Sequence, residues 1–264
     1  MMRDLDANRK AISGKPAGSV DLKDFTDARV LLGRFGAGQP TTAAQSFLLD
    51  HARARQAVWS QVDWSELAVN LSDLGLPILR VDSLASDRST YIKRPDLGRR
   101  LSEASATRLA SVDAGQDIVI IVADGLSANA VSLNAAPLIR ALVQRFRSEK
   151  MSVGLLVLAA QARVALGDPI GELLKAKVSV LLVGERPGLS ASDSLGAYVT
   201  YAPQTGTPDS RRNCVSNIRD GGLQIDTAAE EIVALTADMR RTGISGVGLK
   251  DALGALARSA EVAR

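Results

Sequence analysis

Short runs of apolar residues alternate with segments of helical periodicity along most of the chain. Runs that are apolar at consecutive positions, without a polar residue at every second one, are typical of strands buried on both faces. This pattern predicts strands at residues 77–82, 117–123, 153–160, 178–183 and 196–201.

The segments between these runs carry apolar residues at helical spacing. They predict helices at residues 22–34, 41–61, 65–74, 95–111, 134–150, 169–176, 227–243 and 248–258, with loops at 86–91 and 211–217. Doubly buried strands separated by helices indicate an α/β fold with a doubly wound, mainly parallel, Rossmann-like sheet. We therefore expect a flexible tail at 1–21, an N-terminal helical region at 22–75 and an α/β domain at 76–264.

Composition narrows the class of protein. A chain of 264 residues that is 46% hydrophobic can bury a substantial core. Its 32 Lys and Arg residues nearly balance 29 Asp and Glu residues, and no basic block is interleaved with aromatics, which argues against nucleic acid. The longest apolar run is too short for a membrane span, and the single cysteine fits a reducing cytoplasm.

Polar residues follow the predicted strands. Parallel strands end at one edge of a sheet, where open α/β sheets bind ligands. The side chains expected there are Asp124, Arg163, Glu185, Arg186 and Cys214. Each also has a purely structural interpretation: Asp124 as a helix cap, Arg163 as a solvated side chain, Glu185 and Arg186 as an exposed pair, and Cys214 as a small core residue.

The sequence lacks the residues that several kinds of site require. One histidine and one cysteine cannot form an ordinary zinc site, and we expect no metal site. The chain has neither the glycine pattern of dinucleotide-binding folds nor a P-loop. The serine in residues 122–127 lacks the flanking glycines of a nucleophile elbow. His51 lies within a predicted helix, so it is expected to be a packed or surface residue.

Ordered segments over residues 22–250 resemble the small (light) subunit of ethanolamine ammonia-lyase. They are residues 32–34 with Gly36, 49–55, 86–91 with 94–98, 122–127, 167–172, 182–189, 192–195 and 214–218. Any one segment is a weak signal, but eight in the same order are specific. The N-terminal tail and the last dozen residues lie outside the resemblance.

The resemblance implies a subunit of an adenosylcobalamin-dependent lyase that converts ethanolamine to acetaldehyde and ammonia by a radical mechanism. It implies a large catalytic subunit as partner, six copies of each subunit, and ethanolamine bound mainly by the large subunit. It further implies cobalamin contacts at Val164, Glu185 and Cys214, and no catalytic residue in this chain. The histidine motif that ligates cobalt in some cobalamin domains is absent, so His51 is not expected to be an axial ligand.

Two other interpretations stay open. The chain could be a stand-alone α/β enzyme that binds a small molecule through Asp124, Glu185 and Arg186, or it could be an assembly scaffold. The poverty of catalytic side chains favours the cofactor-binding subunit. The sequence favours the cytoplasm and leaves packaging in a bacterial microcompartment undecided.

Overall fold

The structure, a computed structural model, describes residues 22, 25, 26, 28–30, 32, 37–113 and 115–262. The chain divides into two compact units, Met1–Asp50 and His51–Arg264. In the first unit Arg29 pairs with Asp50, and its guanidinium lies 5.6 Å from the centroid of the Phe47 ring. The tail expected at 1–21 lies outside the described residues, and the division of the chain at residues 22 and 76 stays a prediction.

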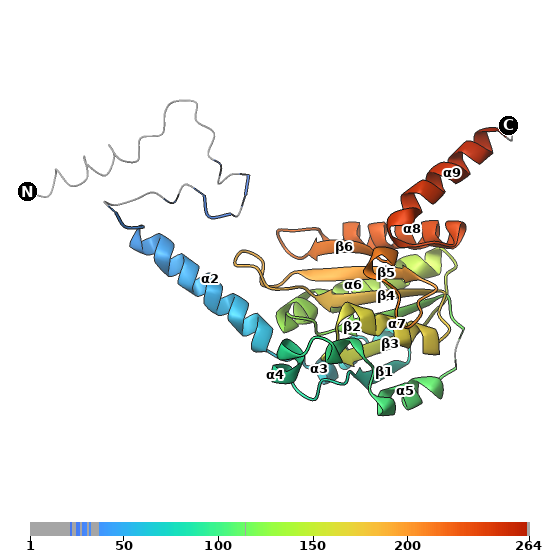
Figure 1. Cartoon of the computed structure of the whole chain (residues 1–264), viewed down its shortest axis with the longest axis horizontal. Coiled ribbons are helices and arrows are strands. Elements are labelled where there is room, and N and C mark those ends of the chain that lie inside the picture. The colour runs from blue at the N-terminus through green and yellow to red at the C-terminus, as the bar shows by residue number, and fades with distance from the viewer. Residues whose placement is uncertain are drawn as a thin grey trace, which may run out of the picture. The chain divides into compact units, whose positions relative to one another are not determined.

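A six-stranded sheet of order β1-β3-β2-β4-β5-β6 forms the centre of the second unit. Its strands follow one another from β6 near the top of Figure 1 to β1 near the bottom. They are β1 (Ile78–Asp82), β2 (Ile118–Ala123), β3 (Val153–Ala160), β4 (Val178–Gly184), β5 (Leu195–Tyr201) and β6 (Asn213–Ile218). The first four strands pair in parallel, whereas β5 and β6 are antiparallel to their neighbours. The fold is therefore mixed α/β with a mostly parallel sheet, and its Rossmann-like, doubly wound character stays a prediction.

Helices cover both faces of this sheet. Along β2, Ile118, Ile120 and Val122 join a large core with residues of α6 and α8, while Val119, Ile121 and Ala123 join a smaller core with residues of α5 and α7. The α-helices are α2 (Thr41–Trp59), α3 (Trp64–Asn70), α4 (Arg88–Lys93), α5 (Glu103–Ala110), α6 (Ala128–Ser148), α7 (Gly167–Leu173), α8 (Ile225–Thr242) and α9 (Leu249–Val262). Short 3₁₀ turns are η2 (Ser72–Leu74), η3 (Leu97–Arg99), η4 (Val164–Leu166), η5 (Asp209–Arg211) and η6 (Gly246–Gly248). None of the helices among the described residues has the length and apolar character needed to cross a bilayer.

All predicted strands are confirmed, each within one residue of its expected bounds. The direction of the fifth strand has a simple cause. A parallel connection needs a dozen or more residues and usually a helix, and only residues 185–194 join β4 to β5. The chain therefore turns back, so that Leu195 lies opposite Gly184 and β5 begins where β4 ends.

Two segments that we expected to be loops are regular structure. Residues 86–91 include the start of α4, because the Asp87 carboxylate caps the helix by accepting the Thr90 N–H at 2.9 Å. Residues 211–217 include most of β6, an edge strand in which only Val215 and Ile218 are buried. Such a half-exposed strand lacks the apolar run that marked the others.

The predicted N-terminal helices differ in outcome. Those at 41–61 and 65–74 are present as α2 and as α3 with η2, and Gly75 ends the latter with φ +66°. The segment predicted as one helix at 95–111 is instead η3 followed by α5. The helix predicted at 22–34 falls partly on residues outside the described set, and the described residues of that range form no α-helix.

Candidate functional site

A pocket of about 450 Å³ opens on the face of the sheet that carries the smaller core. It is lined by Pro95, Arg99, Arg163, Val164, Ala165, Tyr198, Asp209, Arg212 and Cys214. We call it the Cys214 pocket. Its walls come from η3 and the segment before it, from η4 and the loop before it, from β5, and from η5 and β6 with the residue between them. Segments far apart in the sequence thus meet around one cavity.

Asp124 holds the loop that brings Val164 to the pocket. Its Oδ2 accepts the Gln161 N–H at 3.0 Å, and its Oδ1 accepts the Ala162 N–H at 2.9 Å. Gln161 has φ +52°, a backbone conformation that non-glycine residues adopt only when their surroundings stabilise it. Burial raises the pKa of the Asp124 carboxyl, and the backbone N–H groups and the Arg88 guanidinium act in the opposite direction.

Asp124 does not cap a helix, although its position in the sequence suggested that it would. Ser127 caps α6 instead, since its hydroxyl accepts the Ala130 N–H at 3.1 Å. Both carboxylate oxygens of Asp124 are used by backbone N–H groups, and Arg88 Nη1 lies 3.4 Å from Oδ2. Asp124 therefore acts as a buried anchor.

Tyr91 orients Arg163 along the pocket wall. The Arg163 guanidinium carbon lies 4.4 Å from the centroid of the Tyr91 ring, and its Nη2 lies 3.4 Å from the Tyr91 carbonyl oxygen. The Tyr91 hydroxyl donates to the Ala162 carbonyl at 3.0 Å, and burial raises the pKa of this phenol. Gly98 permits this packing, because a Cβ there would lie 2.9 Å from the Tyr91 ring.

Cys214 and Tyr198 lie opposite each other on β6 and β5. Partial burial raises the pKa of the Cys214 thiol, although the residue keeps an exposed surface. A hydrogen bond with Tyr198 lowers that pKa, and the charge of Glu185 raises it. Burial, with contributions from Cys214 and Glu185, raises the pKa of Tyr198 to about 12. A thiol with a raised pKa is a poor nucleophile at neutral pH, so the site favours contact over covalent chemistry.

Glu185 lies at the end of β4 and is not among the residues that line the Cys214 pocket. Its Oε2 accepts the Ser194 hydroxyl at 2.5 Å and the Asn217 N–H at 3.2 Å. Its Oε1 accepts no hydrogen bond from the described residues, and a Cβ at Gly196 would lie only 2.9 Å from it. The carboxylate is thus fixed through Oε2, and Oε1 remains available to accept a hydrogen bond from a ligand.

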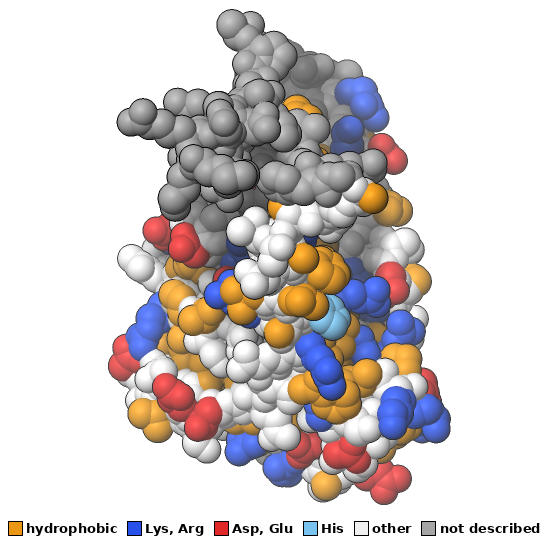
Figure 2. Space-filling model, turned by 90° about the vertical axis from the view of Figure 1, so that its left-hand side faces the viewer, with side chains coloured by type: hydrophobic (Ala, Val, Ile, Leu, Met, Phe, Trp, Pro, Cys, Tyr) orange, Lys and Arg blue, Asp and Glu red, His pale blue; other side chains and the backbone are white. Residues whose placement is uncertain are grey.

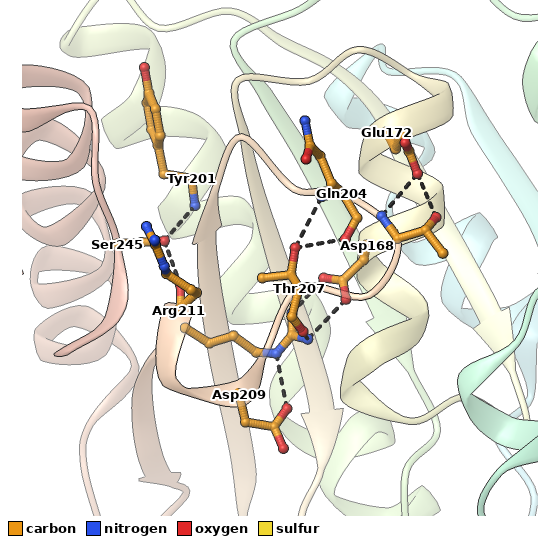
Figure 3. A network of polar contacts seen from close by, with 10 residues as sticks. Asp168, Glu172, Tyr201, Gln204, Thr207, Asp209, Arg211 and Ser245 are labelled. Carbon is orange, nitrogen blue, oxygen red and sulfur yellow. Dashed lines mark hydrogen bonds and ion pairs between the residues drawn. The ribbon is translucent and has the colours of Figure 1, made fainter. Parts of the chain in front are cut away.

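A buried ion pair fixes the far wall of the pocket. Arg212 and Asp168, 3% and 2% exposed, form a bidentate pair in which Nη2 lies 2.9 Å from Oδ2. Arg212 also donates to the Thr207 carbonyl at 2.5 Å and lies 3.2 Å from an Asp209 oxygen. Figure 3 shows Asp168, Thr207 and Asp209 converging at this point between α7 and the β5–β6 connection. The start of β6, and with it Cys214, is therefore held against α7.

The structure brings Val164 and Cys214 together in one pocket, and the charge of Glu185 acts on the same thiol. Arg163 lines the pocket. Asp124 does not line it but holds the loop before Val164 through two backbone hydrogen bonds, and Arg186 is exposed. Sequence reasoning missed the side chains of Tyr198 and Arg99. A tyrosine inside the predicted strand at 196–201 was the available signal for the first, and no signal marked the second.

The surface around His51 is different in character. His51 is exposed on α2 and lines a shallow hollow with Ala52, Arg55 and Trp59. Figure 2 shows the histidine among apolar and basic side chains on this side of the molecule. Among the described residues, no three His, Cys, Asp or Glu side chains gather as metal ligands would.

The sequence is similar to one protein family over most of its length. Residues 17–250 match the family model described as ethanolamine ammonia-lyase light chain (EutC). The ethanolamine ammonia-lyase small subunit of Rhodopseudomonas palustris (strain BisA53) is 49% identical over 88% of this chain and 89% of that protein. The small subunit of Azotobacter vinelandii (strain DJ) is 47% identical over 92% of this chain and 89% of that protein. On the extent of these matches, the chain belongs to the ethanolamine ammonia-lyase light chain family.

Proposed function

We propose that this chain is the small subunit of an adenosylcobalamin-dependent ethanolamine ammonia-lyase and that it binds the cofactor against a large catalytic subunit. The complex converts ethanolamine to acetaldehyde and ammonia by a radical mechanism. The observation that carries the proposal is the meeting of Val164 and Cys214 in one pocket, beside the carboxylate of Glu185. The family relationship supports the role of a subunit, and the geometry of this pocket supports a contact with the cofactor.

The residues present suit one edge of a corrinoid. A corrin is amphipathic and edged with amides, and it needs an apolar surface with a few fixed polar groups. Pro95, Val164 and Ala165 provide apolar surface, and the Arg163 Nε is buried without a partner. A corrinoid is larger than this pocket, so the remainder would be covered by the partner subunit.

The bound cofactor would supply the radical by homolysis of its cobalt–carbon bond. This chain's residues bind, orient and exclude water. Val164 presents an aliphatic side chain to the ligand, and Glu185 Oε1 accepts from an amide N–H or a ribose hydroxyl. Cys214 contributes a small, protonated contact, because its pKa is raised.

The test of activity is reconstitution. The isolated chain should release no ammonia from ethanolamine, whereas its complex with the large subunit and adenosylcobalamin should. The complex should also show the visible spectrum of a bound corrinoid. Turnover by the isolated chain would support the stand-alone enzyme instead. That alternative has lost Asp124 as an available acid or base, because both of its oxygens are occupied.

Glu185→Ala should weaken retention of cobalamin in the complex by about 1–3 kcal/mol, the cost of losing a buried hydrogen bond. Glu172→Ala is a matched control, because Glu172 also accepts a hydroxyl and a backbone N–H, both from Thr205. Unlike Glu185, it lies on α7 and is not among the groups whose charge acts on the Cys214 thiol. Equilibrium binding measured by the corrinoid spectrum checks both variants. Equal affinities for the two variants would remove Glu185 from the site.

The proposal extends to assembly and location. We propose a hetero-oligomer with six copies of each subunit, with ethanolamine bound mainly by the large subunit, in the cytoplasm. Sedimentation of the purified complex tests the stoichiometry.

A further inference from the structure

The Cys214 pocket carries unbalanced positive charge on one side. Three of its lining residues are arginines, and Arg212 is paired with Asp168 and Asp209. Neither Arg99 nor Arg163 has an ion-pair partner among the described residues. The one carboxylate of the lining, Asp209, is engaged with Arg212, so Arg99 and Arg163 are the lining cations left without an ion-pair partner among the described residues.

The two guanidinium groups come from backbone segments that touch each other. The Arg163 N–H donates to the Gly98 carbonyl at 2.8 Å, directly before Arg99. A Cβ at Gly98 would lie 3.0 Å from Arg163 Cγ, so the segments are in close contact. The loop that carries Arg163 is in turn held by Asp124. The pair is thus placed by backbone hydrogen bonds and by a buried anchor.

Arg163 has an unused donor in a buried position. Its Nε is buried and has no hydrogen-bond partner, although its guanidinium is stacked on Tyr91. Leaving such a donor unpaired costs free energy, and an acceptor on a ligand bound beside Arg163 would recover it. A planar guanidinium is well suited to a phosphate, which it can bind through two parallel hydrogen bonds.

We propose that Arg99 and Arg163 form a subsite for the phosphodiester of the cobalamin nucleotide. This inference rests on the proposed function. The amides and hydroxyls at the periphery of cobalamin are neutral, and the phosphodiester is its anionic group. The subsite fixes the orientation of the cofactor on this chain: the nucleotide lies toward η3 and the β3–η4 loop, beside Val164.

Cobinamide provides the test, because it keeps the corrin and lacks the nucleotide with its phosphodiester. Affinities of the assembled complex for cyanocobalamin and dicyanocobinamide are measured by equilibrium dialysis with the corrinoid absorbance as readout. Arg99→Gln and Arg163→Gln should each weaken cyanocobalamin binding about tenfold, the change that about 1.4 kcal/mol produces, and leave dicyanocobinamide binding unchanged. Arg100→Gln, a change of the exposed neighbouring arginine outside the pocket lining, should alter neither affinity.

The outcomes separate this inference from the proposed function. Equal weakening of both corrinoids, or no weakening of either, overturns the phosphodiester subsite while the cobalamin role stands. Loss of subunit association with unchanged affinity per assembled complex overturns it too, because the arginines would then meet an acidic group of the large subunit. A wild-type complex that binds neither corrinoid removes the proposed function itself.

Discussion

Replacing Asp124 by alanine tests the idea that one buried carboxylate organises the pocket. The Ala162 N–H, in a fully buried residue, would lose its acceptor, and the Gln161 N–H would lose its acceptor in a partly exposed position. Arg88, 6% exposed, would keep its hydrogen bonds to the Val58 and Gly125 carbonyls but lose its counter-charge.

The expected cost is large for a single substitution. Removing one partner of a buried ion pair costs about 3–5 kcal/mol, against about 5–15 kcal/mol of total stability for a typical domain. For a chain of this size, that predicts a fall of about 10 °C in the unfolding midpoint. Thermal unfolding followed by circular dichroism measures the shift, and amide hydrogen exchange should show lost protection at Ala162.

The matched control is Asp96→Ala. Asp96 also forms a bidentate pair, with Arg94, but both side chains are more than half exposed. Solvent replaces such contacts at little cost, so its midpoint should hardly change. If Asp124→Ala unfolds at the same temperature as Asp96→Ala, the anchoring role is wrong. If Asp124→Ala does not fold, Asp124→Asn, which keeps one acceptor, should show a smaller shift of the same sign.

Two further predictions concern titration. The hydrogen bond from Lys177, together with those from Ser152, lowers the pKa of the Asp117 carboxyl from 3.8 to about 2. This carboxylate therefore stabilises the fold above pH 3.8, and its contribution disappears as the pH falls towards 2. Asp117→Asn should therefore lower the free energy of unfolding by about 1 kcal/mol at pH 7, allowing for solvent screening, and should match the wild type near pH 2. Urea unfolding at several pH values measures this difference. A difference that stays constant at all pH values would contradict the assignment. Tyr198→Phe removes the hydrogen bond that lowers the pKa of Cys214. Alkylation of the thiol by iodoacetamide, followed by mass spectrometry, should therefore reach half its maximal rate at a higher pH than in the wild type. A shift to lower pH would refute the assignment.

Much of the fold could be predicted because its signals are local. The runs in β2, β3 and β4 are apolar at nearly every position, since both faces of these strands are covered by helices. The edge strand β6 was missed because one of its faces meets solvent and only two of its residues are buried. The start of α4 was missed because its capping residues are as polar as a loop.

The residues of the candidate site also fall into those that the sequence could indicate and those that only the fold brings together. The sequence alone placed Val164 and Glu185 after strands, and its similarity to a known family singled out these residues and Cys214. Only the tertiary structure decided that β5 and β6 turn back beside β4, which brings Cys214 opposite Tyr198 and across the pocket from Val164. It also decided that Asp124 is an anchor and that Arg99 and Arg163 share one wall. Such contacts join segments that lie far apart along the chain. Residue type and spacing within one segment do not determine which distant side chain contacts it.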